Sequence, residues 1–249
     1  MDKEIKHMGD LIRMKLVKTR ANGQEQKKPS SQTTGISSGQ RTKFTPAELE
    51  NAGIYKRYQN VTFSAIEHRK LPENKTIVKN YGLAKKYAQQ SDEKFAAGQG
   101  LIFSGGYGTL KTTMAVAILR DWLEKGHRGL FVPMCSLMDN LYTMKALNKE
   151  EFARYDKRIR STPLLILDDL GGEDADGWVN GKVDSIITER YNKMLPTIIT
   201  TNMTPEELAK AYSRRIIDRL CNTSPILVFN DESQRRKLWG VNSGAPKEG

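Results

Sequence analysis

Short apolar runs alternate with amphipathic segments over most of the chain. The runs are uniformly apolar, as expected for strands that are buried on both faces of a sheet. The segments between them carry apolar residues at helical spacing, such as Ala115, Ile118, Leu119 and Trp122. This alternation predicts an α/β fold with a central parallel sheet flanked by helices. The predicted strands are 101–103, 129–133, 164–167, 197–202 and 225–229.

The first 43 residues follow a different pattern. Residues 1–20 carry apolar side chains at helical spacing, from Ile5 to Leu16, with lysines and arginines on the other faces. This pattern predicts a small helical arm. Residues 21–43 are polar and rich in Ser, Gln and Gly, which predicts a flexible linker. The arm either docks on the 44–249 domain or binds a partner, and the linker favours a partner.

Helix signals mark several further segments. Thr45-Pro46-Ala47-Glu48 has the pattern of a capping box with proline at the first helical position. The segment 55–63 mixes aromatic and basic residues, and it either stacks a nucleic-acid base or packs the leading segment onto the domain. Further helices are predicted over 76–94, 136–160, 181–194 and 213–220.

The chain is basic, with 40 Lys and Arg against 29 Asp and Glu and a formal net charge of +11. This charge favours a polyanionic partner such as nucleic acid. The segment 145–160 is either a solvated face or a contact for DNA, and we expect Lys157, Arg158 and Arg160 to contribute. No apolar run approaches the length of a membrane span. Cys135 and Cys221 lack metal-ligand spacing, and we expect a cytoplasmic protein without a membrane partner.

A glycine-rich loop joins the strand at 101–103 to the helix that follows. Strand, glycine loop, Lys-Thr and helix in this order predict a phosphate-binding loop, in which backbone N–H groups surround a triphosphate. We expect Lys111 to reach the β- and γ-phosphates of ATP and the Thr112 hydroxyl to bind Mg²⁺. The residues predicted to contact the nucleotide are Gly105, Gly106, Tyr107, Gly108, Thr109, Leu110, Lys111, Thr112 and Thr113.

One position departs from the usual loop pattern, because Leu110 stands where a glycine normally precedes the lysine. The position directly precedes the predicted helix, so we expect right-handed backbone angles there, which leucine tolerates well. On this basis we expect Leu110 to weaken ATP binding only modestly relative to glycine. We also expect that replacing Leu110 by glycine would cost some stability of the fold.

Two carboxylates follow the apolar run Leu164–Leu167 at the predicted carboxyl edge of the sheet, where ligands of open α/β sheets bind. In a nucleotide site the first acid, Asp168, holds Mg²⁺ and the second, Asp169, polarises the attacking water. The strand at 197–202 ends in the polar residues Thr200, Thr201 and Asn202.

From about residue 55 to 237 the chain resembles the AAA+ ATPases of the DnaC/DnaI helicase-loader and IstB group. The blocks that carry the resemblance include GQGLIFSGGYGTLKTTMAVAI (98–118), LLILDDLGGE (164–173), PTIITTN (196–202) and RRIIDRL (214–220). The resemblance implies catalytic roles for five residues. Lys111 matches the Walker A lysine, Asp169 the second Walker B acid and Asn202 sensor I, while Arg219 matches the arginine finger and Arg235 matches sensor II.

The resemblance also implies a biological role. Loaders bind a hexameric replicative helicase through an N-terminal segment, assemble with ATP and contact single-stranded DNA, and the arm at 1–20 fits such a segment. Two alternatives remain open: an IstB-like transposition helper that acts on duplex DNA, and an adaptor that binds ATP with little hydrolysis.

Overall fold

The computed structural model of the chain describes residues 44–68, 74–171 and 177–229, and for 145–147 and 177–178 it describes the backbone alone. The arm at 1–20, the linker at 21–43 and Arg235 lie outside these residues, so what the sequence predicts for them stays a prediction. Within the described ranges, no helix is both long enough and apolar enough to cross a membrane.

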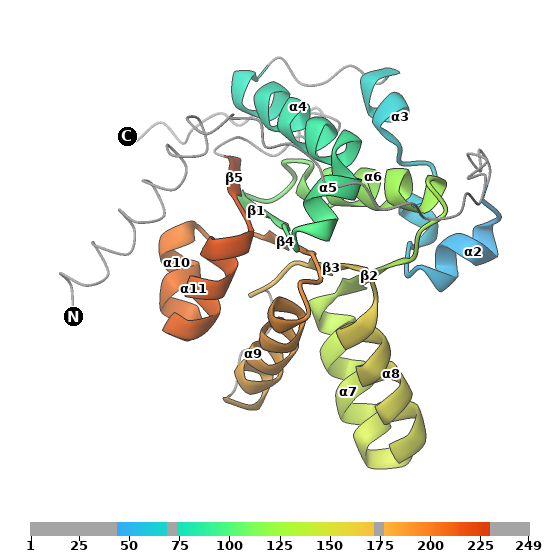
Figure 1. Ribbon diagram of the computed structural model, residues 1–249, viewed down its shortest axis with the longest axis vertical. Coiled ribbons are helices and arrows are strands. Elements are labelled where there is room, and N and C mark those ends of the chain that lie inside the picture. Colours follow the sequence, from blue (N-terminus) through green and yellow to red (C-terminus); the bar gives the residue numbers. More distant parts are fainter. Residues whose placement is uncertain (1–43, 69–73, 172–176, 230–249) are drawn as a thin grey trace, which may run out of the picture.

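Five parallel strands form one sheet in the order β2-β3-β4-β1-β5 (Figure 1), which confirms the predicted fold class. Because β4 lies between β1 and β3, the carboxyl ends of these three strands are neighbours. The strands are β1 (Leu101–Gly105), β2 (Gly129–Pro133), β3 (Leu164–Asp168), β4 (Thr197–Thr201) and β5 (Ile226–Phe229).

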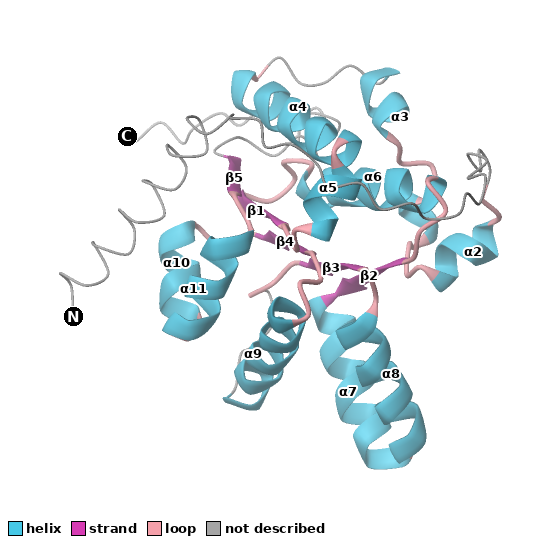
Figure 2. Cartoon of the chain, in the orientation of Figure 1, coloured by secondary structure: helices cyan, strands magenta, loops and turns pink. Residues whose placement is uncertain are grey.

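Helices cover both faces of the sheet (Figure 2). One face carries α2 (Pro46–Asn51), the 3₁₀ turn η1 (Lys56–Tyr58), α3 (Phe63–His68), α4 (Lys75–Gln89), α5 (Ser91–Ala96) and α6 (Lys111–Glu124). The other face carries α7 (Met134–Leu147), α8 (Lys149–Ser161), α9 (Gly177–Asn192), α10 (Pro205–Ala211) and α11 (Arg214–Thr223).

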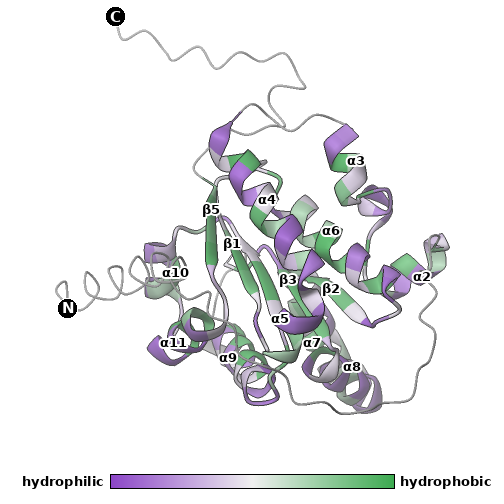
Figure 3. Ribbon diagram, turned by 45° about the horizontal axis from the view of Figure 1, so that its top comes forward, coloured by the Kyte–Doolittle hydropathy of each residue, from purple (hydrophilic) through white to green (hydrophobic). Residues whose placement is uncertain are grey.

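The core consists of two apolar layers because side chains alternate between the two faces of each strand. In β1, Leu101 and Phe103 join the layer beneath α6, whereas Ile102 joins the layer beneath α7 and α11. Figure 3 shows the strands mostly in green between helices that carry both apolar and polar faces. The burial of both faces explains why the strands read as continuous apolar runs in the sequence.

Two predicted helices are each divided in the structure. The segment predicted as one helix over 76–94 forms α4 and α5, with Gln90 between them. The segment 136–160 forms α7 and α8, because the Asn148 side chain accepts hydrogen bonds from the backbone N–H groups of Glu150 and Glu151 and so begins a new helix. An asparagine side chain favours this capping position over a helix interior.

The leading segment closes one edge of the sheet. The backbone N–H of Phe131 in β2 donates to the Ala52 carbonyl at 2.8 Å. Next in the chain is Gly53, with φ +78°, where a Cβ atom would lie 2.0 Å from the Phe131 carbonyl oxygen. Tyr55 and Tyr58 pack on the Phe131 ring, with centroids 6.3 and 6.2 Å away. These contacts support the packing alternative for the aromatic residues of 55–63.

Candidate functional site

The predicted nucleotide residues meet at the carboxyl ends of β1, β4 and β3. The glycine loop follows β1, Asn202 follows β4, and Asp168 ends β3. Side chains that are far apart in the sequence therefore lie side by side, at the edge where ligands bind in parallel α/β sheets.

Lys111 is the buried cation of this site. Its side chain begins at the first residue of α6, and the residue is only 6% exposed. The ammonium Nζ donates to the carbonyl oxygens of Gly105 and Gly106, both at 2.7 Å, and to Asn202 Oδ1 at 2.9 Å. Three short bonds match the three hydrogens of an ammonium group. Lys111 is thus held above the loop and tied to the end of β4.

Leu110 adopts a left-handed conformation, with φ 70° and ψ 11°, so the predicted right-handed backbone is wrong. The residue is the N-cap of α6, outside the regular helix, and the turn of the loop sets its angles. The left-handed region costs an L-residue roughly 1–2 kcal/mol. The partly buried side chain packs against the core layer beneath α6, which offsets part of this cost.

The loop and the helix that follows provide an anion cradle. No side chain caps the N-terminus of the 14-residue helix α6, so its first backbone N–H groups face the loop without a capping side chain. Thr109 closes the loop by donating from its hydroxyl to the Gly106 carbonyl at 2.8 Å. Tyr107 is 71% exposed at the loop. A helix N-terminus beside a buried lysine suits a phosphate group.

Asp168 lies beside two hydroxyl groups. Thr200 donates from Oγ1 to Asp168 Oδ1 at 2.6 Å. Burial raises the pKa of Asp168, and the hydroxyl groups of Thr200 and Thr112 act on this pKa in the opposite direction. The hydroxyl predicted to bind Mg²⁺ and the acid predicted to bind Mg²⁺ are therefore close to each other.

Asp169 and Asn202 complete a continuous polar chain. The Asn202 amide nitrogen donates to Asp169 Oδ1, while its amide oxygen accepts from Lys111. Asp169 is exposed and has φ 63°, which is uncommon for a residue other than glycine but tolerated by aspartate. One amide thus joins the predicted phosphate-binding lysine to the predicted catalytic acid.

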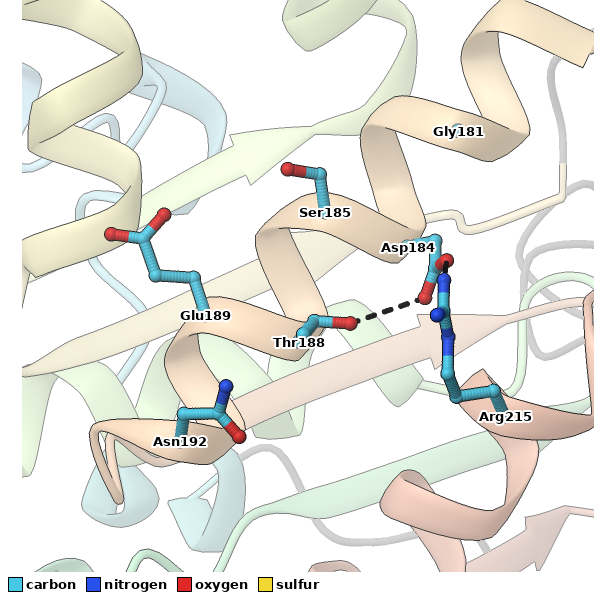
Figure 4. A pocket seen from close by; sticks show the side chains of 7 residues that line it. All are labelled: Gly181, Asp184, Ser185, Thr188, Glu189, Asn192 and Arg215. Carbon is cyan, nitrogen blue, oxygen red and sulfur yellow. Dashed lines mark hydrogen bonds and ion pairs between the residues drawn. The ribbon is translucent and has the colours of Figure 1, made fainter.

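Arg219 lies apart from these residues, on α11. Its Nη1 donates to Thr188 Oγ1 at 2.6 Å and lies 3.7 Å from Asp184 Oδ1, both on α9. Arg215, one turn earlier, also pairs with Asp184 and is far more exposed. A pocket of about 450 Å³ lies beside α9 and is lined by Asp184, Thr188 and Arg215, among others. Figure 4 shows these side chains, with the Arg215 guanidinium next to the Asp184 carboxylate. In the single chain, then, the predicted arginine finger rests against its own α9.

The sequence did not reveal the roles of the two threonines that end β4. Thr200 contacts Asp168, and Thr201 donates to the Leu170 carbonyl at 2.6 Å. Ser104 of β1 donates to the Met203 carbonyl at 2.7 Å and ties β1 to the residues after β4. Buried hydroxyls at the ends of two strands were the available signal, since such groups need partners.

Known proteins resemble this chain over the same region. The replicative helicase loader DnaI of Bacillus subtilis is 31% identical over 121 residues, which are 47% of this chain and 38% of DnaI. The replicative helicase loader DnaC of Escherichia coli K12 is 26% identical over 161 residues, which are 63% of each protein. The matches therefore span less than two thirds of these relatives' own length.

Structural comparison gives the same resemblance. A crystal structure of the DnaC helicase loader superimposes with a TM-score of 0.63 and 28% identity, over 71% of this chain and 100% of that one. The family model of IstB-like ATP binding proteins matches residues 64–239, a range that contains the glycine loop, the two acids and Asn202. The predicted resemblance is confirmed: the chain belongs to the family of IstB-like ATP binding proteins.

Proposed function

We propose that the chain binds ATP with Mg²⁺ at the carboxyl ends of β1, β4 and β3 and hydrolyses it. The observation that carries this proposal is the continuous polar chain from Lys111 through Asn202 to Asp169. Lys111 and the first N–H groups of α6 bind the phosphates. Asp169 accepts the proton of the attacking water, and Asn202 orients that water.

Thr112 and Asp168 are the groups that would hold Mg²⁺, which supplies positive charge at the phosphates. The Thr112 hydroxyl lies close enough to Asp168 to lower the pKa of its carboxyl group, and this proximity supports the role. Among the described residues, no cluster of three His, Cys, Asp or Glu residues could hold a metal ion. This fits a Mg²⁺ ion that takes one or two protein ligands and completes its shell with phosphate oxygens and water.

We infer that the ATPase acts as a replicative helicase loader. The support is the resemblance to DnaC in both sequence and structure. The arm at 1–20 would bind the helicase, and the linker at 21–43 would tether it. The family description favours one alternative, the IstB-like transposition helper. The departure at Leu110 favours another, an adaptor that binds ATP and hardly hydrolyses it.

Self-assembly would complete the ATP site through Arg219. An arginine finger acts on the nucleotide of a neighbouring subunit. The contacts of Arg219 with Thr188 and Asp184 are polar and partly exposed, so a phosphate of a neighbouring subunit could replace them. Sensor II, Arg235, keeps the role that the resemblance implies.

Single-stranded DNA is the proposed polyanionic partner, and α8 is the proposed contact. Arg154, Lys157 and Arg158 are exposed along its outer face. Arg160 does not belong to this set: its guanidinium pairs with Asp156 at 2.6 Å and Glu189 at 2.8 Å, and its side chain is 12% exposed. The expectation that Arg160 contacts DNA is therefore replaced by a structural role for this residue.

Phosphate release, measured with and without single-stranded DNA, tests the ATPase. We expect Mg²⁺-dependent phosphate release by the wild type. Asp169→Asn should still bind ATP but release no phosphate, because a neutral amide cannot accept the proton of the attacking water. Equal release by both proteins would contradict the role of Asp169. Binding without release by the wild type would favour the adaptor.

Co-purification with a replicative helicase separates the loader from the transposition helper. For the loader, we expect the helicase to co-purify with the full chain and not with a chain that lacks residues 1–20.

Mixed assemblies test the arginine finger. Arg219→Ala should bind ATP as a monomer but lose assembly-dependent hydrolysis, by about 10³-fold. Lys111→Ala subunits, which keep Arg219, should restore hydrolysis at the neighbouring Arg219→Ala sites. Arg215→Ala is the matched control on the same helix. If Arg219→Ala hydrolyses ATP normally at every protein concentration, Arg219 is not the finger.

A further inference from the structure

The Thr200 hydroxyl lies between the two acids of the site. Oγ1 donates to Asp168 Oδ1 at 2.6 Å and accepts from the backbone N–H of Asp169 at 2.9 Å. Thr200 is only 2% exposed, and β4 pairs directly with β3. A single buried hydroxyl is therefore hydrogen-bonded to the side chain of one acid and to the backbone of the other.

This arrangement fixes two different things. The bond to Asp168 sets the direction of the carboxyl group. The bond from the Asp169 N–H stabilises the left-handed turn at that residue, where φ is 63°. That turn presents the Asp169 carboxylate to the Asn202 amide. Because the hydroxyl accepts one bond and donates the other, each strengthens the other in a buried environment.

The turn after β3 has further support from the same end of β4. The Leu170 N–H donates to the Thr200 carbonyl at 2.8 Å, and the Thr201 hydroxyl donates to the Leu170 carbonyl. Thr201 also accepts from the Met203 N–H at 3.0 Å. Both hydroxyl bonds of Thr201 thus end on backbone groups outside the two acids, whereas those of Thr200 end on the Asp168 side chain and the Asp169 backbone. The neighbouring threonines provide a natural pair for comparison.

We propose that Thr200 is a positioning residue for both acids: it orients Asp168 toward Mg²⁺ and holds Asp169 in the turn that hydrolysis requires. This inference rests on the ATPase function proposed above. A methyl group in place of the hydroxyl would remove the 2.6 Å bond that orients Asp168 and would leave the Asp169 N–H without the Thr200 oxygen that accepts from it. Metal use and turnover would then suffer together, while phosphate binding at Lys111 would not.

The test replaces Thr200 by Val, which keeps the shape and removes the hydroxyl, and by Ser, which keeps the hydroxyl. Thr201→Val is the matched control. For each protein the Mg²⁺ concentration for half-maximal nucleotide binding, the kcat and KM for ATP, the affinity for ATP without Mg²⁺ and the melting temperature are measured. Should Thr200→Val fail to fold, Thr200→Cys replaces the hydroxyl by a weak donor of similar size.

We expect Thr200→Val to raise the half-saturating Mg²⁺ concentration about tenfold and to lower kcat at least tenfold, as for a lost hydrogen bond to a charged group. Metal-free ATP affinity should stay within about twofold, and Thr200→Ser should recover most of the loss. Thr201→Val should lower the melting temperature and leave the Mg²⁺ dependence unchanged.

Three results would overturn the inference: an unchanged Mg²⁺ dependence in Thr200→Val, no recovery in Thr200→Ser, or an equal Mg²⁺ shift in Thr201→Val. A wild type that binds ATP with Mg²⁺ but releases no phosphate contradicts the proposed hydrolysis, and the Mg²⁺ dependence of binding still tests Thr200. A wild type that binds no nucleotide overturns both proposals.

Discussion

Two buried cations lie at opposite edges of the same sheet. Arg190 is completely buried where β3 and β4 begin, and Lys111 is 6% exposed where β1, β4 and β3 end. Arg190 donates to five oxygen atoms, and four of them are backbone carbonyls, those of Ile159, Thr162, Pro163 and Pro196. The fifth is the hydroxyl of Thr197. The hydrogen bonds described for each cation end on neutral oxygen atoms of the protein.

The difference lies in how replaceable these partners are. The carbonyl groups around Arg190 end a helix and begin two strands, so they cannot move without unfolding their elements. One of the partners of Lys111 is the end of a side chain, Asn202, beside an anion cradle. The planar guanidinium satisfies several fixed acceptors, whereas a lysine ammonium accepts new partners more freely. The edge at Arg190, the fixed edge, therefore serves stability. At the opposite edge, the exchange edge, Lys111 can exchange the Asn202 oxygen for an oxygen of a ligand.

The largest expected effect comes from removing the fixed cation. Burial lowers the pKa of Arg190 to about 9, so its guanidinium is protonated at pH 7. Arg190→Leu should lower the free energy of unfolding by about 3 kcal/mol or more, because it leaves several buried acceptors without donors. Urea denaturation measures this loss. Arg190→Lys, with three donors, should have an intermediate free energy of unfolding. An Arg190→Leu variant as stable as the wild type would show that Arg190 is not needed for stability.

Removing the exchangeable cation should give the opposite pattern. Lys111→Ala should weaken ATP·Mg²⁺ binding by about 100-fold, or nearly 3 kcal/mol, through the loss of charged hydrogen bonds to phosphate. Its unfolding free energy should change much less than in Arg190→Leu. Calorimetric titration and urea denaturation of the same two variants measure both quantities. Equal loss of stability in the two variants would mean that Lys111 is also structural.

Leu110 sharpens the contrast, since the backbone at the exchange edge is strained. Leu110→Gly should be more stable than Leu110→Ala by about 1 kcal/mol, because both lose the side-chain packing but only glycine relieves the left-handed conformation. The entropic cost that the sequence predicted for glycine assumed right-handed angles at this position, which the structure does not have. ATP affinity should rise or stay unchanged in Leu110→Gly. If urea denaturation gives the two variants the same free energy of unfolding, the left-handed backbone at residue 110 is not strained.

The smallest effect concerns the cations of α8. Replacing Arg154, Lys157 and Arg158 by alanine should flatten the plot of log affinity for single-stranded DNA against log salt by roughly 0.7 for each phosphate group that is no longer neutralised. Arg160→Ala should lower stability and leave this slope unchanged, because its guanidinium pairs with Asp156 and Glu189. Fluorescence anisotropy at several salt concentrations gives the slopes. If Arg160→Ala changed the slope as much as the triple variant does, Arg160 would also contact DNA.

The sequence predicted the exchange edge much better than the fixed one. Lys111, Asp168 and Asn202 follow apolar strands, and a parallel sheet brings such strand ends together. Nothing around Arg190 marks it in the sequence, because its partners are backbone carbonyl groups that any residue supplies. The backbone of Leu110 could not be predicted either, since its left-handed angles arise from the closure of the loop.

The starts of helices also differ in how well the sequence predicts them. The capping box predicted at Thr45 is present, with Glu48 N–H donating to the Thr45 hydroxyl. The same pattern recurs at Thr204, where Thr-Pro-Glu-Glu begins α10, a helix that was not predicted although the signal was there. By contrast, the break at Asn148 depends on one side chain turning back to the backbone, which helical spacing alone does not reveal.

The three shortest bonds of Lys111 also make Asn202 a competitor of any phosphate. An ammonium has three hydrogens, and all of them are used within the protein, so a phosphate oxygen that binds Lys111 displaces an oxygen of the protein. The Asn202 amide is attached to the same fold, so its effective concentration at Lys111 is constant and is not lowered by dilution. A nucleotide affinity measured on this chain is therefore a relative quantity, the preference of Lys111 for phosphate over its own asparagine.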